Sequence, residues 1–169
     1  MLVAGSWNGV GRPPTSYQLP ATIPSMSSEI VLSLERAHVL GLALWGGASV
    51  LLGAGMVAYL IVQRVRAGLL RHFAAQTAAW GMAELVLAAL WWRGLAARDY
   101  AGAARLLALV RLALVAELGC IAIGATLVLG GWRILRSPGA LGAGLGIIVQ
   151  AAALLLLDGV LLRRLVLGG

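Results

Sequence analysis

The sequence contains no lysine, one cysteine and only six acidic residues among its 169 positions. The single cysteine, Cys120, excludes an intrachain disulfide and a thiolate metal cluster. All 13 basic residues are arginines, and the net charge is +7. Such a balance often accompanies nucleic-acid binding. Here the arginines stand mostly at the ends of apolar segments and form no basic helix, so we exclude a nucleic-acid partner and expect contacts with anionic lipid headgroups.

Charge of either sign is scarce in this chain. Hydrophobic residues make up 61% of the sequence and charged residues 11%, and the mean hydropathy is +0.95. A soluble domain of this composition would expose too much apolar surface to stay dispersed. We therefore expect a multi-pass integral membrane protein whose first partner is the lipid bilayer, in the cytoplasmic (inner) membrane of a bacterium.

Four apolar segments, separated by short breaks that contain arginine, are long enough to cross a bilayer. They predict an all-α, four-helix transmembrane bundle over residues 29–169, with spans at 39–62, 73–92, 106–132 and 139–162. Residues 1–28 contain four prolines and predict a flexible or extended tail, with Met26 as an alternative start. Four spans place both termini on one side. Six arginines flank the spans on that side and five on the other, a small excess that favours the cytoplasm for the termini.

The second span carries a polar and aromatic stripe at a spacing of four residues. The stripe consists of His72, Gln76, Trp80 and Glu84, followed by Ala88 and Trp92. Residues four apart lie on nearly the same helix face. The spacing therefore predicts one continuous face, with a carboxylate near the middle of the membrane, that meets a partner.

Three of the acids, Glu84, Glu117 and Asp158, lie inside the predicted spans. Each costs roughly 2.5–3.5 kcal/mol in lipid, so we expect them to face the bundle interior, a partner or water. Arg111, about 8 Å below the terminal side, has two interpretations. It pairs with Asp158 or Glu84, or it reaches back to the headgroups. The predicted intramembrane polar cluster comprises Glu84, Arg111, Glu117, Asp158, Gln76 and Gln150.

Small residues mark two helix faces for close packing. The face on the first span comprises Gly41, Trp45, Ser49 and Gly53. The face on the fourth span comprises Gly142 and Gly146, which pack either within the chain or between protomers.

The two halves of the chain also look related. An offset of 74 residues pairs Gln76 with Gln150 and Glu84 with Asp158, and a shift of 71 pairs Gly53 with Gly124. Such a repeat predicts two helical hairpins in parallel orientation, related by an axis along the membrane normal. The alternative is that apolar helices align with each other easily.

His38 and His72 raise the question of haem binding. They begin the first and second spans, on opposite membrane faces, so one haem cannot bridge them within a subunit. We interpret both as interfacial histidines. No HExxH motif, nucleophile elbow, P-loop or paired metal-ligand spacing occurs in the sequence. We therefore expect no enzyme activity, no catalytic residue, no metal and no cofactor.

Some of these positions together resemble an uncharacterised family. The likeness rests on His72-x3-Gln76-x3-Trp80-x3-Glu84, on Glu117-Leu118-Gly119 with Gly124, and on Gly142, Gly144, Gln150 and Asp158. The family is a bacterial four-helix membrane family, known as a domain of unknown function, and the likeness covers about residues 36–162. The sequence departs from the family pattern at Glu84, where the pattern has an amide, and at Glu117, which is displaced from an aspartate. The resemblance implies the fold and no activity.

Three functions fit these observations, and the first is favoured. It is a non-catalytic structural or accessory subunit that packs against itself, as a homo-oligomer, or against a larger membrane complex. In that case the polar cluster holds the helices in register. The second is a minimal proton- or ion-coupled transporter or channel that uses Glu84, Glu117, Asp158 and Arg111. The third is a cofactor-binding electron-transfer subunit.

Overall fold

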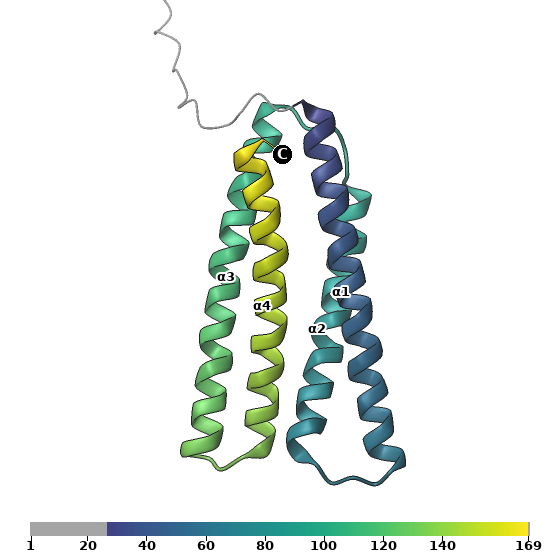
Figure 1. Ribbon diagram of the computed structural model, residues 1–169, viewed down its shortest axis with the longest axis vertical. Coiled ribbons are helices and arrows are strands. Elements are labelled where there is room, and N and C mark those ends of the chain that lie inside the picture. Colours follow the sequence, from purple (N-terminus) through teal and green to yellow (C-terminus); the bar gives the residue numbers. More distant parts are fainter. Residues whose placement is uncertain (1–26, 169) are drawn as a thin grey trace, which may run out of the picture.

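The computed structural model describes residues 27–168, which form four α-helices and no strand (Figure 1). The helices are α1 (Ser28–Val62), α2 (Gly68–Arg93), α3 (Tyr100–Arg133) and α4 (Pro138–Leu167). Each predicted span lies inside one of these helices, so the expectation of an all-α chain with four helices is confirmed. The predicted tail falls almost wholly on residues 1–26, outside the described residues.

Local sequence sets where three of the helices begin. The side chains of Ser27, Asp99 and Ser137 accept hydrogen bonds from the backbone N–H groups three residues later, at distances of 3.4, 2.7 and 3.3 Å. Serine and aspartate are favoured at this position because their oxygens satisfy backbone donors that the first turn leaves free. Pro138 then opens α4, where its missing N–H costs nothing.

The four helices are all long and apolar enough to cross a membrane. They contain 35, 26, 34 and 30 residues. At about 1.5 Å per residue even the shortest is about 39 Å long, more than the roughly 30 Å of a bilayer's hydrocarbon core. α1 and α3 are the longest helices, and both begin before their predicted spans. The difference is largest for α1, which begins at residue 28, 11 residues before its predicted span begins at 39.

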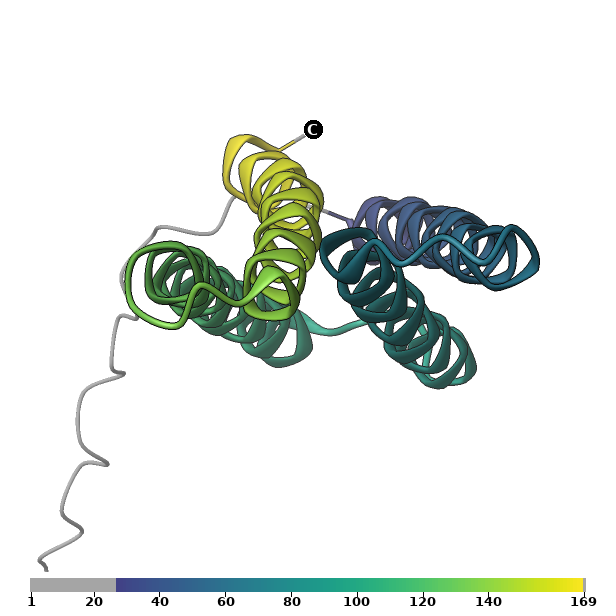
Figure 2. The ribbon, with the colours of Figure 1, turned by 90° about the horizontal axis from the view of Figure 1, so that it is seen from below.

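The helices pack as two hairpins. α1 packs along α2, α3 packs along α4, and the inner helices α2 and α4 join the hairpins; α1 also touches α4 (Figure 2). α1 and α3 run in one direction and α2 and α4 in the other (Figure 1). We call the end where α1 begins and α4 ends the terminal end. The opposite end, which carries the turns at residues 63–67 and 134–137, is the turn end.

Glycines on α4 face two neighbours at once. A Cβ atom added at Gly142 would collide with the carbonyl oxygen of Leu69, and one at Gly146 would lie 3.0 Å from Gln76 Cβ, so both glycines face α2. A Cβ atom at Gly144 would instead lie 2.6 Å from the carbonyl oxygen of Gly124 on α3. The packing face predicted on α4 is therefore used within the chain, and it lets α4 fit closely between α2 and α3.

The α1–α2 contact follows a different set of residues from the predicted one. Its closest points are Gly46 against Gly81 and Gly53 against Ala74. Of the predicted face, Ser49 and Gly53 are buried, whereas Gly41 and Trp45 are only half-buried. A constant step of four residues turns by about 40° per step on a helix of 3.6 residues per turn. The buried stripe instead alternates steps of three and four through Leu42, Gly46, Ser49 and Gly53.

Equivalent glycines form the close contact in each hairpin. Gly53 packs against Ala74 in the first hairpin, and Gly124 packs against Ile148 in the second. These are the positions that the offsets of 71 and 74 residues relate. The contact geometry is therefore what a repeat of the hairpin would produce.

Candidate functional site

A buried glutamate near the start of α1 ties three elements together at the terminal end. Glu35 is completely buried. Arg98, in the loop between α2 and α3, donates to it twice, from Nε to Oε2 at 2.7 Å and from Nη2 to Oε1 at 2.8 Å. Trp91 of α2 donates its indole N–H to Oε1 at 3.2 Å. This two-pronged arginine–carboxylate contact is among the strongest hydrogen-bonded pairs in proteins, and it fastens the loop onto α1.

The Glu35 carboxylate also changes the chemistry of Arg98. Its hydrogen bond and charge raise the pKa of the Arg98 guanidinium above the ordinary value, against a smaller opposing effect of burial. The Arg98 guanidinium therefore stays charged at any physiological pH. We interpret the Glu35–Arg98 pair as a structural clamp, because the arginine donates to both carboxylate oxygens and a guanidinium that is always charged cannot relay a proton.

A histidine–aspartate pair lies next to this clamp. His38 Nε2 of α1 is 3.1 Å from Asp158 Oδ1 of α4, and both side chains are largely buried. The imidazole also packs against the Trp91 ring in a tilted arrangement, with ring centroids 5.2 Å apart. The carboxyl group of Glu117 on α3 is a close neighbour of Asp158. Three ionisable side chains from three different helices therefore meet at this point.

Glu84 of α2 lies inside the bundle without a partner. It is 1% exposed, and neither carboxyl oxygen has a hydrogen-bond partner among residues 27–168. One oxygen of Glu117 and the hydroxyl of Thr77 are also buried without a partner in this part of the chain. Buried polar groups are normally satisfied, so such exceptions require an explanation.

The three buried acids lie close to one level along the bundle. α2 and α4 are parallel and Gln76 packs beside Gly146, so eight residues further on Glu84 is level with residue 154. α3 is antiparallel to α4 and Gly124 packs beside residues 144 and 148, so seven residues earlier Glu117 is level with about residue 153. Asp158 lies about one helical turn, roughly 6 Å, nearer the terminal end.

Further hydrogen bonds continue from this level towards the turn end. Trp45 donates its indole N–H to Gln150 Oε1 at 2.6 Å, and Gln150 donates to the hydroxyl of Ser49 at 3.0 Å. Gln150 is 1% exposed. We call these groups and those above the polar seam. From the terminal end, it comprises Arg98, Glu35, Trp91, His38, Asp158, Glu117, Glu84, Trp45, Gln150, Ser49 and Thr77.

Arg111 is not part of the polar seam. Its side chain is exposed, and it forms no ion pair among residues 27–168, where the pairs are His38–Asp158 and Arg98–Glu35. The expected ion pair of Arg111 with Asp158 or Glu84 is therefore not formed, and the alternative, in which the side chain reaches back to the headgroups, stays a prediction. Asp158, which was one of the two expected partners of Arg111, pairs with His38 instead.

The predicted stripe on α2 does not form one face. Glu84 and Ala88 are buried, Gln76 and Trp80 are half-buried, and His72 is exposed. His72 Nδ1 lies 2.8 Å from the carbonyl oxygen of Gly68 in the preceding turn of its own helix. The same drift of about 40° for every four residues explains this result. The buried face of α2 is instead Ala74, Thr77, Gly81, Glu84 and Ala88.

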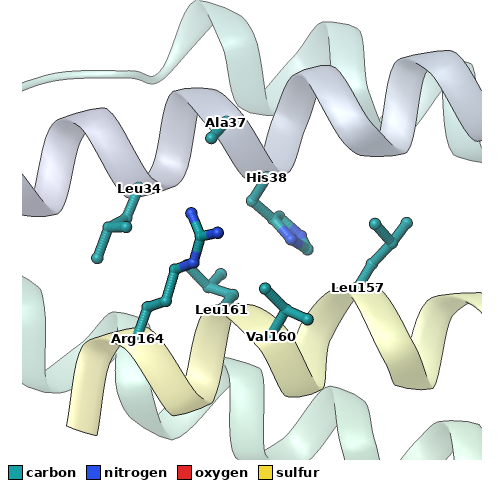
Figure 3. A pocket seen from close by; sticks show the side chains of 7 residues that line it. All are labelled: Leu34, Ala37, His38, Leu157, Val160, Leu161 and Arg164. Carbon is teal, nitrogen blue, oxygen red and sulfur yellow. The ribbon is translucent and has the colours of Figure 1, made fainter. Parts of the chain in front are cut away.

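Two pockets open on either side of the His38–Asp158 pair. One, of about 260 Å³, lies between α1 and α4 and is lined by His38 and Arg164 among others (Figure 3). The other, of about 390 Å³, lies against α2 and α3 and is lined by Asp158, Trp91 and Arg98. The pair therefore separates two spaces, one of which adjoins the imidazole and the other the carboxylate.

Sequence reasoning missed Glu35, Arg98 and Trp91, and it interpreted His38 as interfacial. Glu35 precedes the first predicted span, which begins at residue 39, and Arg98 lies between the second and third predicted spans. One signal was available: Glu35 and His38 extend the alternating spacing of Leu42, Gly46 and Ser49 towards the start of α1. Nothing in the sequence indicates that the loop brings Arg98 back to this face. No group of three histidine, cysteine or acidic side chains within residues 27–168 is placed to hold a metal ion.

The sequence matches DUF6992, a family of unknown function, over residues 41–159. The chain belongs to this family. The expected kinship with an uncharacterised family is therefore confirmed. No curated protein matches the chain, and no solved structure does. The matched DUF6992 segment contains Glu84, Arg98, Glu117 and Asp158, whereas Glu35 and His38 precede it.

Proposed function

We propose that the protein spans a membrane and moves protons through it along the polar seam, as a minimal proton-coupled transporter or channel. The observation that carries this proposal is Glu84, a fully buried carboxyl group with no partner among the described residues. A residue that served only to hold helices together would be hydrogen-bonded across an interface, as Gln150 is. Ionisable groups without such a partner, at this depth of a membrane-spanning bundle, mark proton or ion pathways.

The residues of the polar seam divide into roles. Glu84 is the central proton carrier, and the Asp158–Glu117 pair exchanges a proton with it through water, one helical turn nearer the terminal end. His38 connects that pair to the pocket between α1 and α4. On the other side of Glu84, Gln150, Ser49 and Thr77 offer hydrogen-bonding groups towards the turn end. Glu35 and Arg98 hold the terminal end together and carry no proton. The proposal involves no catalysed covalent step and no cofactor.

The test is proton flux in lipid vesicles that contain the purified full-length protein and a trapped pH-sensitive dye. We expect an imposed pH gradient to dissipate faster than in empty vesicles, and Glu84→Gln to abolish the difference because an amide cannot exchange a proton. Glu29→Gln is the matched control, since Glu29 is exposed in the first turn of α1. The proposal fails if wild-type vesicles hold the gradient as well as empty ones, or if Glu84→Gln conducts as the wild type does.

A second candidate is an accessory subunit or homo-oligomer, the function that the sequence alone favours. The observation in its favour is the outer surface of α3, which packs along α4 and leaves large apolar side chains exposed, among them Leu112, Val115 and Ile123. Lipid covers such a surface equally well, so the oligomeric state distinguishes a surface that binds protein from one that only contacts lipid. Native mass spectrometry of the protein extracted in a mild detergent contradicts this candidate if it shows only monomers with no bound protein.

We further propose a bacterial cytoplasmic membrane as the location, with both termini in the cytoplasm, and a duplicated hairpin as the origin of the fold. The near-equal arginine counts of the two ends favour this orientation only by one residue. A reporter that is active only in the cytoplasm, fused after residue 169, tests the orientation directly. An inactive reporter on a stably inserted fusion contradicts it.

A further inference from the structure

The pocket between α1 and α4 has the two-part chemistry of an amphipathic ligand site. It is lined by Leu34, Ala37, His38, Leu157, Val160, Leu161 and Arg164, and its volume is about 260 Å³. The aliphatic side chains of Leu157 and Val160 form its wall on α4 (Figure 3). Polar atoms come from the Arg164 guanidinium and from the His38 ring. One end of the pocket is therefore cationic and the other aliphatic.

Arg164 provides the cation. Its side chain extends from α4 into the space between α4 and α1 (Figure 3). Within residues 27–168 it forms no ion pair, because the two carboxylates of this region are already engaged. Asp158 faces His38, and Glu35 accepts both hydrogen bonds of Arg98. The groups around the pocket therefore leave a net positive charge at its mouth.

The position and size of the pocket indicate where its ligand comes from. Arg164 lies in the last turn of α4, so the cation sits near the terminal end of the bundle while the aliphatic wall runs from it towards the middle. A phospholipid in the surrounding leaflet has the same order, phosphate first and acyl chain below. The volume is also just below the roughly 300–1,000 Å³ of pockets that enclose a whole small molecule. It fits the upper part of a lipid whose remainder stays in the bilayer.

We infer that this pocket binds one anionic phospholipid, with the phosphate on Arg164 and the first part of an acyl chain against Leu157 and Val160. The inference rests on the membrane location within the proposed function and does not depend on proton transport.

The experiment is native mass spectrometry of the full-length protein in detergent, titrated separately with phosphatidylglycerol, phosphatidylcholine and oleate. The variants are Arg164→Gln, which removes the cation, and Ala37→Trp, which fills the mouth of the pocket without changing its charge. Arg163→Gln is the matched control, because Arg163 is the neighbouring exposed arginine and does not line the pocket. All four proteins carry the rest of the bundle unchanged.

We expect wild type and Arg163→Gln to bind one molecule of phosphatidylglycerol. Their affinity should be at least about tenfold higher than that of Arg164→Gln and Ala37→Trp. We expect phosphatidylcholine to bind wild type about tenfold more weakly than phosphatidylglycerol. Three outcomes overturn the inference. They are equal loss of binding in Arg163→Gln and Arg164→Gln, equal binding of the two phospholipids, and tighter binding of oleate, which would assign the site to a free fatty acid. None of these outcomes bears on the flux test, so the two proposals fail independently.

Discussion

The two ends of the bundle are held together by different kinds of side chain. At the turn end the contacts between helices are made through glycines, as at Gly53 on α1 and at Gly142 on α4. At the terminal end the helices meet through larger side chains. The buried core there consists of Val31, Leu34, Leu106, Val110, Leu161 and Leu165, with Trp91 packed against it. The charged pairs Glu35–Arg98 and His38–Asp158 also lie at this end.

This difference explains where polar chemistry is able to take place. Glycine contacts bring two backbones together and leave no room for a side chain at the contact itself. At the terminal end larger side chains meet, and the pockets beside His38 and Asp158 lie among them. A third pocket, nearer the turn end, is lined by apolar side chains and uncharged polar groups such as Gln150 and Thr77. The fold therefore joins a tightly packed end to an end that carries the ionisable groups.

The largest effect is expected from Gly142→Leu, which disrupts the helix packing at the turn end. Any side chain at this position meets the Leu69 carbonyl oxygen and the Phe73 backbone, so a backbone must move. The cost should exceed the roughly 1–3 kcal/mol of ordinary overpacking, and we expect little folded protein in detergent. Gly119→Leu is the control, because no other atom among the described residues lies within 4 Å of a Cβ added there. Size-exclusion profiles and thermal unfolding would show the loss of folded protein in Gly142→Leu. Equal behaviour of the two variants would refute the close approach of α2 and α4.

Arg98→Ala is the corresponding substitution at the terminal end. It leaves the Glu35 carboxylate completely buried without its ion pair, which costs about 3–5 kcal/mol in comparable cases. Removing both partners, in Arg98→Ala with Glu35→Leu, should recover most of that loss because no charge then stays buried. Arg93→Ala, an exposed arginine at the end of α2, serves as the control. Thermal unfolding of wild type, Arg98→Ala, Glu35→Leu and the double variant measures the coupling, and additive effects of the two substitutions would contradict a buried pair.

The sequence was sufficient to predict the helices and much of their packing, and insufficient to predict the site. Hydropathy and arginine placement locate four helices because each must offer an apolar surface over its whole length. Gly142 and Gly146 were recognised because close approach requires small residues. The partner of Glu35 depends instead on how the loop before α3 folds back, which local spacing does not encode. The rotation of α1, which turns His38 towards Asp158, is encoded only in the alternating spacing of its buried residues. A fixed step of four residues was itself the reason why His72 and Trp80 were assigned to one continuous face with Glu84.

A smaller effect, of opposite sign, is expected from Glu84→Leu. The carboxyl group has no partner among residues 27–168, so an apolar side chain of similar size removes an unsatisfied group and should stabilise the bundle by about 1–3 kcal/mol. Thermal unfolding in detergent would show a higher melting temperature, by about 2–4 °C per kcal/mol for a chain of this length. Gln150→Leu is the comparison, because it removes the acceptor of Trp45 and should destabilise. A Glu84→Leu variant less stable than wild type would mean that Glu84 serves a structural purpose.

The smallest effect is expected from Trp45→Phe, which removes the indole N–H that Gln150 accepts at 2.6 Å while keeping most of the ring. Hydrogen bonds between membrane helices average about 0.6 kcal/mol and reach at most about 1.7, because an unfolded chain in lipid finds other partners. Ser49 remains to receive the Gln150 amide at 3.0 Å, so the glutamine keeps one partner. We therefore expect a loss below about 1.7 kcal/mol by thermal unfolding, and near-normal proton flux. A loss as large as that of Arg98→Ala would mean that hydrogen bonds in the middle of the bundle stabilise it as much as the ion pair at its terminal end, and the contrast between the two ends would then be wrong.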